Sequence, residues 1–297
     1  MKILVTGATG FIGSKLCESL VLSGHEVDVI TRSKERAQEK LMLPVNFIEG
    51  NLRSSPIQLT SNYDGVINLL GENIGDKRWT KKQKELILNS RQETTRNLYK
   101  SLKNNKGHFF IQASAIGYYK ESIQDQVLSE ESESADNFLA QVCKLWEKES
   151  ESFKENFTHH SIIRLGIVLG DEGGLLNKLL PLYRYGLGGQ LSSGKQWMSW
   201  IHVDDVVSMI NHIIEKNLEG VFNGVAPEPV RNKEFNKQLA TYTNRFAPFR
   251  VPALALKILM GEQSILALAS QKVRSRIIEY GYKFKYPALS DALKDVC

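Results

Sequence analysis

The sequence has few cysteines, no long hydrophobic run and no block of basic residues, and each absence excludes a class of protein. Its 297 residues include three cysteines, Cys17, Cys143 and Cys297, whose wide spacing fits neither a metal site nor a disulfide framework. No apolar run approaches the roughly 20 residues of a membrane-spanning helix. The formal net charge is only +5, so nucleic-acid binding has little support. We therefore expect a soluble, cytoplasmic protein that binds no metal and no membrane.

The hydrophobic residues make up 42% of the chain and occur in two kinds of segment that alternate along it. Apolar, β-rich segments recur at residues 3–6, 26–31, 45–49, 65–70, 109–114 and 161–168. Amphipathic stretches at residues 14–23, 81–104 and 137–156 separate several of them and have the apolar spacing of helices. This alternation predicts an α/β fold, a Rossmann-type doubly wound parallel sheet.

The texture changes after residue 170 to a Gly-rich and aromatic stretch, followed by a helix expected at residues 204–216 and a tail with several prolines. We expect a Rossmann domain made of residues 1–170 and 200–225. A smaller, partly discontinuous C-terminal substrate subdomain would then comprise residues 171–199 and 226–297.

Three glycines follow the first predicted strand in the pattern Gly7-x-x-Gly10-x-x-Gly13. The first two let the backbone approach a ligand closely, and Gly13 lets the following helix pack against the strand. Free amides at the start of that helix favour an anion. The motif predicts a dinucleotide pyrophosphate site that comprises Gly7, Thr9, Gly10, Phe11, Ile12 and Gly13.

The end of the second strand, Thr31-Arg32-Ser33, lacks the carboxylate that usually binds the adenosine ribose of NAD. Arg32 can form paired hydrogen bonds to a 2′-phosphate, and the two hydroxyls can add donors, so NADP is favoured. Alternatively, Arg32 caps a solvated loop or stacks on adenine in either cofactor. We expect Asp28 to be a strand residue that points elsewhere.

Asn51 and Leu52 follow the third predicted strand, where they could contact the adenine edge of a dinucleotide. Asn51 offers both a donor and an acceptor for this contact. A turn-forming role for Asn51 is the alternative.

Several segments together resemble one protein family. They are the glycine motif, Asn68-Leu69-Leu70-Gly71-Glu72, Trp79, Ser90-Arg91-x-x-Thr94-Thr95, Ser114-Ala115-Ile116-Gly117-Tyr118-Tyr119, residues 138–147, 164–170 and 194–205, and Ala226-Pro227-Glu228-Pro229-Val230-Arg231-Asn232. The chain resembles, over essentially its whole length, the atypical extended short-chain dehydrogenase/reductases called epimerase-family proteins. The resemblance implies an NADP-binding epimerase-like domain, with Leu69, Gly71 and Glu72 at the cofactor, and a C-terminal domain of unassigned role.

The resemblance also implies a catalytic Ser, a Tyr, and a Lys four residues after that Tyr, which together move a proton at the substrate oxygen. The chain departs from this pattern. Its one Tyr-x-x-x-Lys match, Tyr99 to Lys103, precedes the 109–114 strand, whereas the catalytic helix follows that strand. Counting back from Glu147 places Leu139 and Cys143 at the expected Tyr and Lys positions.

Other residues could rebuild the catalytic site. Ser114, Tyr118 and Tyr119 are expected near the mouth of the sheet, where polar residues at strand ends line the crevice. Either tyrosine could donate a proton, or could pack as a structural aromatic. Lys144 lies one position beyond the expected Lys, which rotates it by about 100° around the helix.

His202 is the fourth catalytic candidate, as a proton shuttle near neutral pH. Alternatively, it orders the crossover by hydrogen bonding. We expect Asp204 or Asp205 to be the N-cap of the following helix. Arg91 and Arg231 could anchor an anionic substrate, although a solvated helix face is the ordinary expectation for a single arginine such as Arg91.

These features predict an NADP-dependent oxidoreductase or epimerase-like enzyme that acts on a small polar carbonyl or carbinol compound. The missing Tyr and Lys support the alternative, an NADP(H)-binding sensor or scaffold protein with little or no catalysis. The resemblance further implies pairing through the two long helices, hence a possible homodimer.

Overall fold

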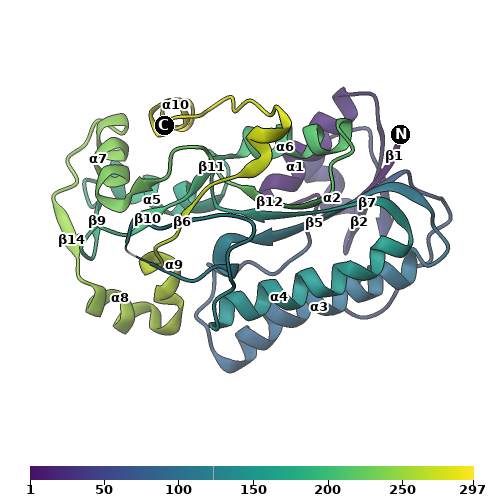
Figure 1. The fold of residues 1–297 in the computed structure, drawn as a ribbon, viewed down its shortest axis with the longest axis horizontal. Coiled ribbons are helices and arrows are strands. Elements are labelled where there is room, and N and C mark those ends of the chain that lie inside the picture. The colour runs from purple at the N-terminus through teal and green to yellow at the C-terminus, as the bar shows by residue number, and fades with distance from the viewer. Residues whose placement is uncertain (123) are drawn as a thin grey trace.

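A seven-stranded parallel sheet runs through the centre of the computed structural model, which describes residues 1–122 and 124–297 (Figure 1). Its order is β12-β7-β5-β4-β1-β2-β3. The strands are β1 (Lys2–Thr6), β2 (Glu26–Thr31), β3 (Asn46–Glu49), β4 (Gly65–Asn68), β5 (Gly107–Ala115), β7 (Phe157–Leu165) and β12 (Gly220–Gly224). β1 pairs with both β2 and β4, so the strand order reverses there. The predicted Rossmann-type fold is confirmed.

Helices cover both faces of the sheet because apolar residues fill one side of each (Figure 1). α1 (Phe11–Leu22) packs against α6 (Val203–Glu215) on one face. On the other face α3 (Lys81–Ser101) packs against α4 (Phe138–Ser150). The predicted helix at 137–156 is therefore two elements, since a 3₁₀ segment, η2 (Glu151–Glu155), follows α4. The short helix α2 (Lys34–Leu41) joins β2 to β3.

Most of the remaining elements lie toward the end of the molecule away from the N-terminus, although the 3₁₀ segment Arg276–Tyr280 packs against β12 of the central sheet (Figure 1). The remaining elements are η1 (Ile116–Tyr118), β6 (Val127–Leu128), β8 (Ile167–Leu169), α5 (Gly174–Arg184), β9 (Gly189–Leu191), β10 (Trp197–Met198), β11 (Trp200–His202), β13 (Val230–Arg231), α7 (Asn232–Tyr242), β14 (Phe249–Val251), α8 (Ala253–Met260), η3 (Gly261–Ser264), α9 (Ile265–Leu268), β15 (Lys272–Val273), η4 (Arg276–Tyr280) and α10 (Leu289–Val296). Four two-stranded pairings, β6–β15, β8–β11, β9–β14 and β10–β13, join segments distant in sequence. The proposed division into two domains stays a prediction.

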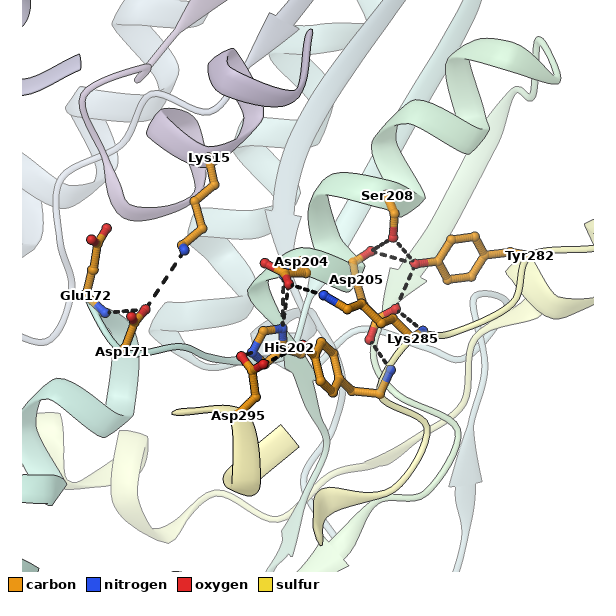
Figure 2. Close-up of polar contacts among 11 residues, drawn as sticks. Lys15, Asp171, Glu172, His202, Asp204, Asp205, Ser208, Tyr282, Lys285 and Asp295 are labelled. Carbon is orange, nitrogen blue, oxygen red and sulfur yellow. Dashed lines mark hydrogen bonds and ion pairs between the residues drawn. The ribbon is translucent and has the colours of Figure 1, made fainter. Parts of the chain in front are cut away.

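The start of α6 differs from the expectation that Asp204 or Asp205 is its N-cap. His202 is the N-cap, and its Nδ1 accepts a hydrogen bond from the Asp204 backbone N–H at 3.2 Å (Figure 2). The fully buried Asp205 carboxylate instead accepts from the backbone N–H groups of Lys285, at 2.7 Å, and Tyr286, at 2.9 Å. Asp205 therefore holds the C-terminal segment against the sheet domain.

Candidate functional site

A cavity of about 600 Å³ opens at the carboxyl ends of β1, β2, β3 and β4, beside the point where the strand order reverses. Eleven of the residues predicted to bind cofactor line it: Gly7, Thr9, Gly10, Thr31, Arg32, Ser33, Asn51, Leu52, Leu69, Gly71 and Glu72. Phe11, Ile12 and Gly13 instead belong to the first turn of α1. Seven further residues complete the lining: Ile30, Arg36, Ala37, Lys40, Gly50, Arg53 and Leu70. A cavity of this volume suits a small-molecule or cofactor ligand.

Two glycines make the close approach between β1, α1 and the loop after β4 possible. Gly7 has a φ of +75°, and a Cβ there would lie 2.8 Å from the backbone carbonyl of Leu69. A Cβ on Gly13 would lie 2.2 Å from the carbonyl oxygen of Gly7. Because both positions exclude a side chain, the start of α1 comes close to the cavity with its first amides unblocked.

Basic side chains dominate the charge at the end of the cavity next to α2. Arg32, Arg36, Lys40 and Arg53 line the cavity together with a single carboxylate, Glu72. In the described parts of the chain, no carboxylate lies within ion-pair distance of Arg32, Arg36 or Lys40. This arrangement can attract a phosphate group.

Sequence reasoning found Arg32 but missed Arg36 and Lys40. The available signal was their spacing of four residues, which places Arg36 and Lys40 on one face of a helix. Ser33 sets the position of that face, because its hydroxyl accepts a hydrogen bond from the Arg36 backbone N–H and caps α2. The Ser33 hydroxyl also bonds Glu35.

Arg53 and Glu72 meet across the cavity in an ion pair of 2.6 Å. Arg53 comes from the loop after β3, and Glu72 comes from the loop after β4. The Asn51 side chain accepts from the Arg53 backbone N–H at 3.2 Å and donates to Ser54, which is the turn-forming alternative for Asn51. The ion pair thus links the two loops that flank the cavity.

The carboxylate of Asp28 points away from the cavity, as expected. It accepts hydrogen bonds from the Tyr63 hydroxyl and from the Asn46 side-chain amide, each at 2.9 Å. Asp28 is buried. The burial of Tyr63, together with its hydrogen bond to Asp28, raises the pKa of the Tyr63 hydroxyl. Within β2, the carboxylate closest to the cavity is therefore engaged in hydrogen bonds to neighbouring side chains and does not face the cavity.

Ser114 ends in a buried ionic network rather than at an open surface. Its hydroxyl donates to Glu147 Oε1 at 2.6 Å, and both Glu147 oxygens accept from Arg164 at 2.9 Å. The side chains of Arg164 and Glu147 are only 5% and 12% exposed. Burial lowers the pKa of Arg164, but hydrogen bonds to Glu147 and its charge outweigh this effect and raise the pKa.

The two tyrosines of the predicted site have different surroundings. Tyr119 is fully buried, and its hydroxyl donates to Asn223 at 2.7 Å and accepts from Arg164 at 2.9 Å. Burial raises the pKa of Tyr119 to about 12, although Arg164 opposes this. Tyr118 is partly exposed, with the Arg164 guanidinium carbon 3.5 Å from its ring centre. Of the four predicted catalytic residues, only Tyr118 is not buried.

The helix face that would carry the catalytic Tyr and Lys carries apolar or unreactive groups. Leu139 packs against Gly117, and the Cys143 thiol lies 3.5 Å from the carbonyl oxygen of Ala115. Burial raises the pKa of Cys143 to about 11, which leaves the thiol protonated near neutral pH. Lys144 donates instead to the Ala135 carbonyl at 3.2 Å. The Tyr99 hydroxyl bonds Glu155, away from these residues.

His202 is buried between the start of α6 and the C-terminal helix (Figure 2). Its Nε2 lies 3.3 Å from an Asp295 carboxylate oxygen, and its ring centre lies 4.0 Å from that of Tyr286. Burial lowers the pKa of His202, against the raising effect of Asp204 and Asp295. Because Nδ1 caps α6, these contacts match the ordering role that was the alternative for His202.

The two arginines considered as substrate anchors lie in separate places. Arg231 stacks on Trp197, with its guanidinium carbon 3.8 Å from the ring centre, and pairs with Asp125 at 2.5 Å. Arg91 reaches from α3 to the loop after β4 and donates to the Glu72 carbonyl at 3.1 Å. Arg91 therefore contacts the Gly71–Glu72 loop, which lines the cavity, but is not itself a lining residue, whereas Arg231 belongs to the β10–β13 region.

The parallel sheet with a cavity at its strand-order reversal defines a Rossmann-type fold with a ligand site at its switch point. The model of the NAD dependent epimerase/dehydratase family matches residues 3–224, and a domain of unknown function, DUF1731, matches residues 251–296. The chain belongs to the NAD dependent epimerase/dehydratase family, and this membership supports a nicotinamide cofactor.

Curated relatives of this family match the whole chain. It is 36% identical to the chloroplastic epimerase family protein SDR39U1 homolog of Arabidopsis thaliana, covering 100% of this chain and 86% of that protein. It is 34% identical to the epimerase family protein YfhF of Bacillus subtilis, covering 100% of this chain and 98% of the relative. These relatives confirm the predicted epimerase-family resemblance.

Solved structures give the same result. The crystal structure of human epimerase family protein SDR39U1 (isoform 2) with NADPH superposes with a TM-score of 0.88 at 32% identity, covering 100% of this chain and 99% of the other. The match to the crystal structure of UDP-galactose 4-epimerase covers 100% of this chain and 97% of that chain, at 17% identity and a TM-score of 0.77, and shows the shared fold alone. Within the described residues, no helix is both long and apolar enough to cross a membrane.

Proposed function

We propose that this chain binds NADP(H) in the cavity beside β1 and acts as an oxidoreductase or epimerase-like enzyme on a small carbonyl or carbinol compound. The observation that carries the proposal is the cluster of Arg32, Arg36 and Lys40 at the end of β2, where an NAD-binding site would have a carboxylate. The NADPH in the human SDR39U1 structure is consistent with it.

The residues around the cavity fit the parts of such a cofactor. The first amides of α1, beside Gly10, would hold the pyrophosphate, and Arg32 with Arg36 would hold the 2′-phosphate. When bound, the cofactor supplies a hydride donor or acceptor. Tyr118 would exchange the proton at the substrate oxygen, since its side chain is partly exposed whereas Ser114 and Tyr119 are buried in hydrogen-bonded networks.

Nucleotide titration tests the cofactor part of the proposal. We expect NADPH to bind more tightly than NADH, and Arg32→Gln and Arg36→Gln each to weaken NADPH by about tenfold through the loss of one charge-assisted contact. Lys34→Gln is the matched control, because it removes the same charge from α2 at a position that does not line the cavity. Equal affinities for NADPH and NADH in the unaltered protein would refute the preference.

A second candidate function, an NADP(H) sensor or scaffold, is favoured by Leu139 and Cys143 at the expected Tyr and Lys positions. The distinguishing measurement follows NADPH absorbance while pools of carbonyl metabolites are added. Substrate-dependent oxidation that Tyr118→Phe lowers, with NADPH affinity unchanged, supports the enzyme. Tight NADPH binding without turnover across broad pools supports the sensor.

A further inference from the structure

Arg91 presents one edge of its guanidinium group to the loop that follows β4. Its Nη1 donates to the carbonyl oxygens of Glu72 and Ile87, both at 3.1 Å. One face of the guanidinium group lies against Gly71. A Cβ at Gly71 would be 2.9 Å from Cζ, 3.0 Å from Nη2 and 3.2 Å from Nε. Because Cζ is the nearest of these atoms, the Cβ would lie over the guanidinium face, and glycine at this position makes room for that face. Among the described residues, Nε and Nη2 have no hydrogen-bond partner.

The charge of Arg91 has no carboxylate beside it. Across residues 1–122 and 124–297, no carboxylate oxygen lies within 4.0 Å of its nitrogens, and the nearby Glu72 carboxylate is paired with Arg53. On its other side, the guanidinium carbon lies 4.7 Å from the centre of the Trp146 ring. Burial lowers the pKa of Arg91 to about 10, and the charge of Glu72, which lies beyond ion-pair distance, only partly opposes this effect.

Two other arginines near α3 and α4, unlike Arg91, each pair with a carboxylate. Arg164 makes a two-bond contact with Glu147, and Arg96 pairs with Glu149 at 2.5 Å. A partly buried arginine whose Nε and Nη2 have no hydrogen-bond partner among the described residues is suited to a planar or tetrahedral oxyanion, which accepts both hydrogen bonds at once. Gly71 and Glu72, which Arg91 contacts, also line the dinucleotide cavity.

We infer that Arg91 binds an oxyanion, a carboxylate or a phosphate, through Nε and Nη2, on a ligand held beside the Gly71–Glu72 loop. The inference rests on the proposed function for the identity of the bound nucleotide, and it adds a second anion site to the one at Arg32 and Arg36. The oxyanion belongs either to the substrate or to the cofactor, and the chemistry of recognition is the same in both cases.

The test uses inorganic phosphate and acetate as probes, at constant ionic strength set with chloride. Tryptophan fluorescence reports binding because Trp146 lies beside the guanidinium. We expect saturable binding of at least one probe in the unaltered protein and in Arg96→Gln, which removes the same charge from an exposed ion pair on α3. Arg91→Gln should weaken that binding about tenfold or more.

A parallel NADPH titration identifies the source of the oxyanion. Loss of probe binding in Arg91→Gln with unchanged NADPH affinity assigns it to the substrate, and an NADPH affinity about tenfold weaker assigns it to the cofactor. Unchanged affinities for both probes and for NADPH in folded Arg91→Gln would overturn the inference. If the unaltered protein fails to bind NADPH, the proposed function fails, while the probe titrations still test Arg91.

Two further variants serve if Arg91→Gln does not fold. Arg91→Lys keeps the charge and removes the two-donor edge, and Gly71→Ala places a methyl group against the guanidinium face, which displaces the group without changing its charge. Each should weaken binding of the probe or of NADPH. Binding like that of the unaltered protein in both variants would contradict the inference.

Discussion

The dinucleotide cavity and the end of β5 both place arginines beside polar loops, but they use the charge differently. In the cavity, Arg32 and Arg36 are exposed and have no carboxylate within ion-pair distance among the described residues. At the end of β5, Arg164 is buried and its donors are taken up by Glu147 and Tyr119. A fully paired guanidinium stabilises the fold, whereas an unpaired one at a cavity is available to a ligand.

The comparison also explains how α4 packs against the sheet without the Tyr and Lys that the family resemblance implies. Ser114 and Arg164 lie opposite each other in the register of β5 and β7, and Glu147 reaches both from α4. This network holds α4 against the sheet through polar contacts. We therefore expect changes in the network to act mainly on stability, and changes in the cavity to act mainly on nucleotide binding.

The largest effect should come from Glu147→Ala, which leaves the Arg164 cation buried without its carboxylate. Removing one partner of a buried pair costs about 3–5 kcal/mol, and denaturant unfolding measures it. Glu149→Ala on the same helix is the matched control, because its partner Arg96 is half exposed. That loss should stay within about 1 kcal/mol. Equal losses in the two variants would remove the distinction between the regions.

Acid should destabilise the protein through His160, a buried histidine at the α4 side of β7. Burial lowers the pKa of His160 to about 4, and its Nε2 bonds Ser150 at 3.1 Å. Between about pH 6.5 and pH 4 the unfolded chain binds a proton here that the folded chain does not, so stability falls as the pH falls. The loss approaches about 3 kcal/mol at the lower end of this range.

Unfolding of His160→Gln at pH 7 and pH 4.5 checks this sign. The variant should lose less stability on acidification than the unaltered protein does. His108→Gln, at an exposed position one strand away, is the control and should keep the full acid sensitivity. An unchanged pH dependence in His160→Gln would show that other groups cause it.

Much of the fold could be predicted because its signals are local. The apolar, β-rich runs placed all six of the predicted strands on or overlapping strands of the central sheet, and the glycine spacing located the turn from β1 into α1. The N-cap of α6 was assigned wrongly because two aspartates follow His202, and capping preferences favour Asp. In the folded protein, the Asp205 carboxylate is buried beneath the C-terminal segment and bonds its backbone, so it does not cap α6.

The site could be predicted only where neighbouring residues in sequence determine it. Arg32 follows β2 directly, so its position was accessible, whereas Arg36 required knowing which face of α2 turns toward the cavity. The Ser114–Glu147–Arg164 network joins residues from β5, α4 and β7. Its geometry depends on strand register and helix rotation, which no local pattern specifies.

His202 offers a smaller and more selective test of the paired region. His202→Ala and His202→Asn both remove the buried ring, but Asn can still accept the Asp204 backbone N–H and cap α6. We expect the Asn variant to be more stable than the Ala variant by about 1 kcal/mol in denaturant unfolding. If the protein turns over a substrate, equal loss of activity in both variants would indicate that His202 also contacts the reacting groups. If His202 only caps α6, the Asn variant should keep more activity than the Ala variant.

The smallest effect on stability should come from the cavity itself. Arg36 and Lys40 are like charges one helical turn apart on α2, so Arg36→Gln removes a repulsion worth a few tenths of a kcal/mol. The ligand-free variant should therefore be as stable as the unaltered protein or slightly more stable, while NADPH binding weakens. Thermal unfolding with and without NADPH measures both quantities in one experiment, since a ligand that binds only the folded state raises the midpoint. A variant that gains stability without ligand and loses the NADPH-dependent increase would show that Arg36 is retained for the ligand rather than for the fold. Parallel losses of stability and of binding would instead place Arg36 with Arg164, among the charges that the fold requires.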